Sequence, residues 1–337
     1  MKKDWIIVSF SGGKDSTAML LHMIEIGDHI DEVLFCDTYK EFPAMYRHVQ
    51  QVKEIVEKAG IKFTEIRSPE SFDFYMFEHQ PKRRTDKYEG LKGYSWAGTR
   101  SRWCTRALKL DVISKYLKSL HKQFNVIQCV GLATDEQYRL ERENNKQKNQ
   151  RHPLVEWGWD ENTCLKYCYS KGFDWEGLYK LFKRVSCWCC PLQSLQELRK
   201  LRSHFPDLWN ELQDMDARTW RKFRADFTVE QLEIRFQLEE QMLAQGKSIT
   251  NKEFHRELKK SLNEGRMIKM NKNLFVSKMK LHGDNQTELA EGIGISVQRL
   301  NAKINETGGA EFTQGEIQRI KDRYSLNNDE VNDIFFN

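Results

Sequence analysis

The sequence predicts an α/β protein: a parallel sheet with helices on both faces, followed by a helical second half and a small all-helical C-terminal domain. Over residues 1–132, short apolar runs alternate with segments of helical length, a pattern typical of parallel sheets covered on both sides. From Asp160 onward the pattern is almost entirely helical, and after Gly265 the sequence reads like the start of an independent domain.

The N-terminal segments show this alternation most clearly. The first expected strand is a short apolar run that ends directly in a glycine-rich loop. The first expected helix places Leu20, Leu21 and Ile24 at helical spacing, and Gly60 ends the second helix. In chain order, the expected strands and helices cover residues 6–10, 17–26, 32–36, 45–59, 62–66, 106–120 and 126–132.

The helical half divides into two parts. We place a domain boundary between about residues 262 and 270, where a charged helical stretch ends. The first domain, residues 1–262, then has an α/β core over about residues 1–135 and a helical, cysteine-containing part over about residues 150–262. The second domain covers residues 270–337.

The composition is that of a globular protein. The chain has 337 residues, of which 39% are hydrophobic and 31% charged. No stretch approaches the roughly 18 unbroken apolar residues of a membrane span, so we expect a cytoplasmic protein with no membrane partner. A net charge of +5 permits a polyanionic partner without requiring one.

The loop Ser11-Gly12-Gly13-Lys14-Asp15-Ser16 follows the first expected strand and opens the first expected helix. Backbone N–H groups and the helix dipole converge at such a position, which favours binding of phosphate oxygens. The two glycines permit close backbone approach, and Lys14 supplies a compact positive charge. The loop lacks the spacing of the Walker A motif.

The same loop resembles the PP-loop of the ATP pyrophosphatase superfamily. Members of this superfamily cleave ATP between the α and β phosphates, adenylate a substrate and release pyrophosphate. The resemblance implies an adenine nucleotide alpha hydrolase-like fold, with ATP and Mg²⁺ bound. It implies catalytic roles for Lys14, Asp15 and Ser16, and nucleotide binding by these three residues together with Ser9, Ser11, Gly12, Gly13, Asp37 and Thr38.

Over about residues 1–262, the chain is similar to the phosphoadenosine phosphosulfate (PAPS) reductase-like branch of that superfamily. By this resemblance, Gly131, Glu136 and Arg139 would hold the second substrate. The matching segments are Phe35 to Thr38 with Glu41-Phe42-Pro43, Arg102 to Thr105 with Leu108-Lys109, Gly131 to Glu136 with Arg139, Pro153 to Trp157, and Arg184 to Pro191.

One departure from that branch bears on the reaction. Dedicated PAPS reductases carry a modified loop without the Lys-Asp pair and need a mobile C-terminal cysteine to attack the sulfonate. This chain keeps Lys14 and Asp15 and has no cysteine after Cys190. Both features argue against sulfonate reduction and for cleavage of ATP at the α–β bond.

Three of the eight cysteines are candidate metal ligands. Cys187 and Cys190 have a metal-type spacing, and the family resemblance adds Cys104. Thiolates in this pattern suit either Zn²⁺ or a [4Fe–4S] cluster. The fourth ligand is open: the candidates are Cys189, Cys164, Cys168, His204 or a free position. Cys164 and Cys168 fit a buried helix face better, and Cys36 and Cys129 fit the core of the sheet.

Residues 270–337 resemble a phage-repressor-type DNA-binding domain. A helix ending near Ala290, a turn containing Gly292 and Gly294, and a helix opened by Ser296 make a helix-turn-helix pattern. Residues 313–324 and 328–335 would be supporting helices. The predicted major-groove contacts are Ser296, Gln298, Arg299 and Lys303.

The charge of this segment leaves a second role open beside DNA binding. Residues 266–337 carry ten Lys or Arg and ten Asp or Glu residues. DNA affinity depends heavily on neutralising phosphates. A net-neutral unit is therefore also suited to contacts with protein, including a second copy of the chain in a homodimer.

The leading functional hypothesis is an ATP-dependent adenylating transferase that transfers sulfur to a nucleic acid, either tRNA or DNA, with the C-terminal domain recruiting the enzyme to DNA. The alternative within enzymes is a sulfonucleotide (PAPS) reductase. An alternative of another class is a DNA-binding regulator whose nucleotide domain only senses a ligand. Fast release of pyrophosphate from ATP would separate the enzyme from the regulator.

Overall fold

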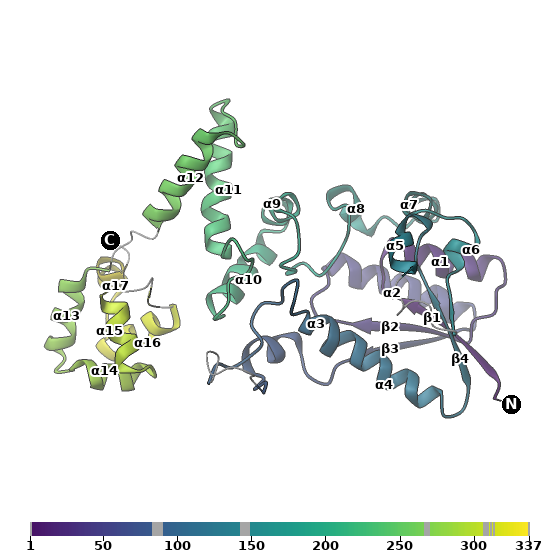
Figure 1. The fold of residues 1–337 in the computed structure, drawn as a ribbon, viewed down its shortest axis with the longest axis horizontal. Coiled ribbons are helices and arrows are strands. Elements are labelled where there is room, and N and C mark those ends of the chain that lie inside the picture. Colours follow the sequence, from purple (N-terminus) through teal and green to yellow (C-terminus); the bar gives the residue numbers. More distant parts are fainter. Residues whose placement is uncertain are drawn as a thin grey trace. The chain divides into compact units, whose positions relative to one another are not determined.

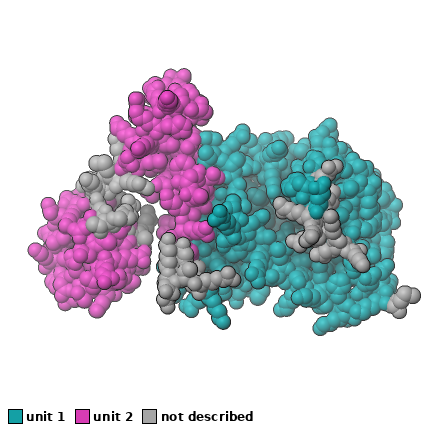
Figure 2. Space-filling view, in the orientation of Figure 1, with its two compact units in different colours: residues 1–209 teal, residues 210–337 magenta. Residues whose placement is uncertain are grey.

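The computed structural model describes residues 2–82, 90–141, 149–265, 270–305, 310, 312 and 314–335. The chain divides into two compact units, Met1–Trp209 and Asn210–Asn337, hereafter the N-terminal and C-terminal units (Figure 2). Among the described residues, no helix combines the length and apolar character needed to cross a bilayer.

The N-terminal unit is built on a five-stranded parallel sheet with the strand order β3-β2-β1-β4-β5 (Figure 1). This order places β1 at the centre, with the first crossover running outward to β2 and β3 and the chain then returning to β4. Ligands of such sheets bind where the direction of crossover reverses. The strands are β1 Asp4–Phe10, β2 Glu32–Asp37, β3 Lys62–Arg67, β4 Asn125–Val130 and β5 Gln150–Arg151.

Helices cover both faces of this sheet, which confirms the predicted fold class (Figure 1). The π-helical turns are η1 Phe74–Glu78 and η3 Arg106–Leu110, and the 3₁₀ turns are η4 Thr134–Glu136 and η6 Trp175–Gly177. The α-helices up to the unit boundary are α1 Lys14–Glu25, α2 Pro43–Lys58, α3 Trp103–Thr105, α4 Asp111–Leu120, α5 Gln137–Leu140, α6 Pro153–Glu156, α7 Glu161–Ser170, α8 Leu178–Leu181, α9 Leu195–His204 and α10 Pro206–Ala217, in which the boundary falls.

The two faces of the sheet are buried by different helices. Ile7, Leu34 and Val126 form one apolar cluster, against which α4 packs. Phe10 lies on the opposite face, with its ring 6.3 Å from that of His48 on α2. Figure 1 shows α4 on one side of the sheet and α1 and α2 on the other. Burial on both faces explains why the central strands β1 and β2 are largely apolar, whereas the edge strand β3 carries charged, exposed residues.

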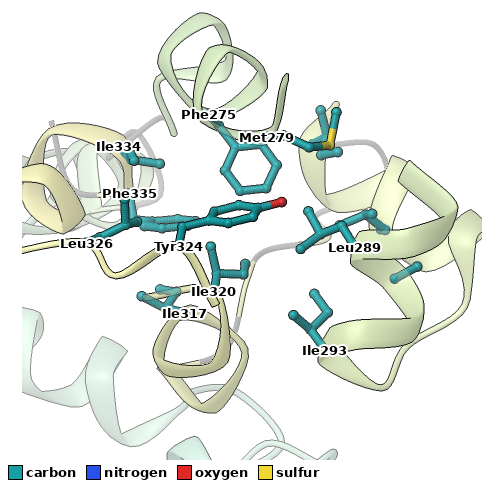
Figure 3. Close-up of a cluster of buried hydrophobic side chains, with 13 residues drawn as sticks. Phe275, Met279, Leu289, Ile293, Ile317, Ile320, Tyr324, Leu326, Ile334 and Phe335 are labelled. Carbon is teal, nitrogen blue, oxygen red and sulfur yellow. The ribbon is translucent and has the colours of Figure 1, made fainter. Parts of the chain in front are cut away.

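The C-terminal unit is entirely helical in its described residues. A small cluster of Met242, Phe254 and Leu258 joins the first pair of helices, and a separate core lies within the last five. Figure 3 shows that second core, with the Tyr324 ring at its centre. After α10, the helices are α11 Val229–Ala244, α12 Lys252–Gly265, α13 Lys272–Leu281, α14 Gln286–Ile293, α15 Val297–Ile304, α16 Gln314–Tyr324 and α17 Asn328–Phe335.

The predicted domain boundary near residues 262–270 stays a prediction. Residues 266–269 of that segment lie outside the described residues. The compact units divide earlier, between Trp209 and Asn210. The two apolar clusters of the C-terminal unit nevertheless contain no residue in common, so the last five helices have a core of their own.

Candidate functional site

The loop between β1 and α1 leads into a helix end that no side chain caps. Gly13 is the cap residue. Among the described residues, nothing accepts a hydrogen bond from the backbone N–H groups of Asp15 and Ser16. Free amides at the positive end of a helix dipole bind phosphate oxygens well. The end of α1 therefore presents the donors that a phosphate group needs.

Hydrogen bonds from distant segments hold the loop in shape. The Ser11 N–H donates to Ser16 Oγ at 3.1 Å, and Ser16 Oγ donates to the Gly13 carbonyl at 3.0 Å. The Trp175 indole N–H donates to the Gly12 carbonyl at 2.8 Å, and the Lys14 N–H donates to the Tyr179 hydroxyl at 2.9 Å. The loop is therefore preorganised rather than dependent on a ligand for its conformation.

Two glycines permit the close packing around this loop. Gly12 has a φ of +78°, and a Cβ placed there would lie 2.6 Å from Met45 Sδ. At Gly131, just after β4, a Cβ would lie 3.0 Å from Ser16 N and Cα. The sequence motif placed Gly131 in a second-substrate segment. In the structure it lets the end of β4 approach the first turn of α1.

Lys14 is the buried cation of the site. Its side chain is 10% exposed, and Nζ lies 3.1 Å from Asp15 Oδ2 and 2.7 Å from Glu161 Oε2. Burial lowers the pKa of Lys14, but the hydrogen bonds and charges of Glu161 and Asp15 outweigh this effect and raise it. Lys14 is therefore charged throughout the neutral pH range.

The residues present fit the predicted Mg²⁺. Burial raises the pKa of Asp15, although the charge of Lys14 opposes the shift. Asp15 Oδ1 is buried and has no hydrogen-bond partner among the described residues, which costs free energy. Mg²⁺ takes carboxylate and phosphate oxygens as ligands. Asp15 and Glu161 are thus the side chains that would hold the ion beside the phosphates.

The loop opens into a cleft of about 1060 Å³, which is at the upper end of the roughly 300–1,000 Å³ typical of ligand pockets. The cleft is lined by most of the predicted nucleotide contacts of this loop, namely Ser9, Ser11 and residues 13–16. Gly12 does not line it. The lining includes four acids and six cations, an excess that suits a polyphosphate. Those six cations are Lys14, Lys109, Lys118, Arg139, Lys183 and Arg184.

Asp37 and Thr38 do not line this cleft, although they were predicted to contact the nucleotide. Asp37 Oδ1 accepts hydrogen bonds from the Tyr39 N–H and the Tyr46 hydroxyl. Thr38 Oγ1 donates to Glu41 Oε1 at 2.7 Å. Both side chains thus serve the turn after β2, which corrects their predicted role. Cys36 of the same strand lines the cleft instead.

The predicted second-substrate side chains lie together at the cleft. Glu136 and Arg139 form an ion pair of 2.5 Å and both line the cleft. Arg139 keeps 40% of its side chain exposed. A partly exposed arginine in the cleft is positioned to contact an anionic ligand.

Three cysteines, Cys104, Cys187 and Cys190, were the predicted metal ligands. Among the described residues, no group of three or more His, Cys, Asp or Glu side chains is arranged to hold a metal ion. Cys187 Sγ instead contacts Thr38 and Glu41 at 3.6 Å. Burial raises the pKa of Cys104, Cys187 and Cys190, which keeps the thiols protonated. A metal site held by Cys104, Cys187 and Cys190, with Zn²⁺ or a [4Fe–4S] cluster, therefore stays a prediction.

The other cysteines are core residues, as predicted. Cys36 and Cys129 are buried in β2 and β4, and Cys164 and Cys168 are fully buried on α7. Cys168 Sγ donates to the Lys14 carbonyl at 3.4 Å. Their burial packs α7 against the first turn of α1 and thereby brings Glu161 to Lys14.

Three functional residues were missed by the sequence reasoning. Glu161, Trp175 and Tyr179 all support the loop, yet they lie about 150 residues further along the chain. Glu161 follows Asp160, whose side chain caps α7 by accepting from the Thr163 N–H. That capping pattern marks the start of a helix, but it does not reveal that the start of this helix lies beside Lys14.

His48 connects the stability of this site to pH. It is buried beneath the loop helix, where Nε2 lies 2.9 Å from Thr17 Oγ1, and burial lowers its pKa to about 4. An unfolded histidine has a pKa near 6.5, so the unfolded chain binds more protons between these two values. Stability is therefore lost as the pH falls through this window.

We expect the fold to lose about 2 kcal/mol of unfolding free energy through His48 between pH 7.5 and pH 5. Urea unfolding followed by tryptophan fluorescence measures this, because eight of the nine tryptophans lie in the N-terminal unit. The variant His48→Gln should show a pH dependence smaller by that amount. An unchanged dependence would show that His48 is not the responsible group.

The predicted DNA contacts in the C-terminal unit differ in their exposure: three are exposed and one is buried. Ser296, Gln298 and Arg299 are exposed at the start of α15, where Ser296 Oγ accepts from the Arg299 N–H. Lys303 is 4% exposed and its Nζ lies 2.8 Å from Glu316 Oε2, which is equally buried. A lysine held in this way cannot reach a DNA groove. The structure thus corrects the prediction for Lys303.

Comparisons with known proteins match the part of the chain that carries the cleft. Residues 5–193 match the phosphoadenosine phosphosulfate reductase domain family. The uncharacterised protein MJ0066 of Methanocaldococcus jannaschii is 28% identical over 218 residues, which are 62% of this chain and 41% of that protein. A second, MJ0973 of the same organism, is 25% identical over 62% of this chain and 47% of its own length. The chain thus spans less than half the length of these relatives.

Proposed function

The chain belongs to the phosphoadenosine phosphosulfate reductase domain family, and on that premise we propose that it cleaves ATP at the α–β bond, adenylates an acceptor and supports sulfur transfer to a nucleic acid. The observation that carries this proposal is Lys14, a buried and charged lysine at the uncapped end of α1.

The residues of the loop support the first step as follows. An acceptor oxygen attacks the α-phosphorus of ATP, the bond between that phosphorus and the bridging oxygen breaks, and pyrophosphate leaves. The N–H groups of Asp15 and Ser16 and the charge of Lys14 stabilise negative charge that grows on the phosphates. Mg²⁺, held by Asp15 and Glu161, would neutralise further charge there.

The second step follows from the product of the first. Adenylation converts an acceptor oxygen into a good leaving group, and a sulfide-level donor displaces AMP, so that sulfur replaces that oxygen. Arg139 is exposed at the rim of the cleft and lies beside Glu136. It is suited to position an anionic acceptor such as a polynucleotide, either DNA or tRNA.

Sulfonucleotide reduction is the second candidate, because the family takes its description from that reaction. The two are separated by incubating the full chain, purified anaerobically, with ATP or with PAPS while measuring pyrophosphate, AMP and sulfite. Pyrophosphate and AMP from ATP support adenylation. Sulfite from PAPS, without cleavage of ATP, would overturn it. Tight ATP binding without turnover would instead support a nucleotide-sensing regulator.

We further propose that residues 270–337 act as a helix-turn-helix unit. The features that support this are the Asn285 cap of α14, the left-handed Gly294 that ends α14, and the Ser296 cap of α15. Arg299 is exposed on α15 and is the strongest candidate for a base contact. The competing role, contact with protein or with a second copy of the chain, needs no such exposed donor.

If this unit binds DNA, Arg299→Ala should weaken specific binding by about 1–3 kcal/mol, because one base contact is lost. A mobility-shift titration measures the effect. Lys280→Ala is the matched control, since Lys280 is exposed on α13 outside the predicted groove contacts. The absence of any shift at low salt, with both specific and random duplexes, would contradict DNA binding.

A further inference from the structure

A second cavity, of about 660 Å³, opens at the carboxyl end of β3. It shares no lining residue with the ATP cleft, although α4 contributes to both. Ser68 and Pro69, which directly follow β3, form part of its wall. No step of the proposed reaction uses this cavity.

Aromatic rings line the cavity in near-parallel orientation. The rings of Tyr75 and Tyr94 are 6.4 Å apart with an interplanar angle of 21°, and those of Tyr94 and Trp103 are 5.5 Å apart at 20°. His79 lies 4.8 Å from the Tyr94 ring. Tyr75 and Tyr94 are only partly buried. A cavity walled by parallel, accessible rings is suited to another flat ring, because every nucleobase has a π-face that can stack.

The side chains that line the same cavity carry a net positive charge. Its lining contains three cations, Arg102, Arg106 and Lys115, and one acid, Asp111. Arg106 and Asp111 lie 3.6 Å apart, with 81% and 63% of their side chains exposed. Arg102 and Lys115 are exposed and form no ion pair with any residue that the structure describes. Cations at the rim of an aromatic cavity are placed to contact phosphates.

The cavity is also built rigidly. The N–H groups of Gly93 and Tyr94 donate to the carbonyls of His79 and Tyr75 at 2.7 and 2.9 Å. The Trp103 indole N–H donates to the Ser95 carbonyl at 2.9 Å. The cavity is lined by residues of η1 and η3, and π-helical turns are rare and frequently found at functional sites. The walls are therefore preformed, which limits the ordering cost of binding.

We infer that this cavity binds an unpaired nucleobase of a polynucleotide, with Tyr75 and Tyr94 stacking against the base and Arg102 and Lys115 contacting flanking phosphates. The inference rests on the proposed function, in which a polynucleotide is the acceptor. The cavity and the ATP loop lie at the same edge of the sheet, with β2 between them. The ends of β3 and β1 are two strand spacings apart, about 10 Å, a span that one strand of nucleic acid can bridge.

Fluorescence anisotropy of the full chain with a labelled single strand of about ten nucleotides, as DNA and as RNA, tests this inference. Excess unlabelled duplex is added to occupy any duplex-binding surface. Tyr75→Leu should weaken binding about tenfold through lost stacking. Arg102→Ala combined with Lys115→Ala should reduce the slope of log affinity against log salt by about 1.4.

The matched control is Lys58→Ala combined with Lys166→Ala, which removes two exposed charges outside the cavity and should leave both values unchanged. Equal binding by the wild type and the cavity variants, or no binding of single strands, would overturn the inference. Competition by free AMP as strong as that by the oligonucleotide would overturn the assignment to a polynucleotide. Release of pyrophosphate from ATP, measured on the same preparations, reports separately on the proposed function.

Discussion

Lys14→Ala should reduce ATP-dependent pyrophosphate release by roughly 10²–10³-fold, the typical cost of removing one preorganised electrostatic contact to a transition state. Lys14 Nζ is buried and lies within 3.1 Å of two carboxylates. Its removal would leave Asp15 and Glu161 facing the phosphates without the charge that balances them. The substitution should therefore lower both ATP affinity and turnover.

Two conservative substitutions distinguish a loss of catalytic function from a loss of folding. Lys14→Arg keeps the charge, while Glu161→Gln keeps the size of the side chain that holds Lys14. If Lys14 acts only structurally, Lys14→Ala should lower the melting temperature, and activity should fall only in proportion to the loss of folded protein. Full pyrophosphate release by Lys14→Ala would remove the loop from the mechanism.

Gly93→Ala should give the largest loss of stability, at least about 3 kcal/mol, through the combined cost of a left-handed residue and a steric clash. Gly93 has a φ of +68°, and a Cβ there would lie 1.9 Å from the Met76 carbonyl oxygen and 2.7 Å from Phe77 Cα. These atoms belong to the backbone of η1. A rotamer change therefore cannot relieve the contact, and the segment must move.

Gly60→Ala is the matched control for this prediction. Gly60 has nearly the same φ, +74°, but a Cβ there meets nothing within 4 Å. It should lose only the conformational term of roughly 1 kcal/mol. Thermal unfolding of both variants, followed by tryptophan fluorescence, separates the two terms. Equal losses of stability in Gly93→Ala and Gly60→Ala would show that residue 93 does not lie this close to the backbone of Met76.

The fold could be predicted from the sequence because its pattern is local. The central strands of a parallel sheet are buried on both faces, so β1 and β2 are largely apolar runs. Gly60 follows the second helix at the point where its periodicity ends. At most ends of these elements, the predicted bound differs from the observed one by one to three residues. The π-helical turn η3 is the exception: it begins the segment that was expected to be a single α-helix from residue 106.

The site could be predicted only where its residues are contiguous. Ser11 to Ser16 form one loop, so their spacing reports their chemistry. Glu161 and Tyr179 reach Lys14 across about 150 residues, and no local pattern records such a contact. The predictions for Asp37, Thr38 and Lys303 needed correction for the same physical reason. A polar residue at a suitable position satisfies a nearby partner before it is free for a ligand.

The position of the bond broken in ATP tests the central claim most directly. The full chain is incubated with Mg²⁺, ATP labelled at the α-phosphate and total cellular RNA or DNA as acceptor, and the labelled products are separated over time. The account predicts AMP, free or attached to the acceptor, together with an equal amount of pyrophosphate, and neither product with Lys14→Ala. Formation of ADP and phosphate, or binding of ATP without any cleavage, would contradict it.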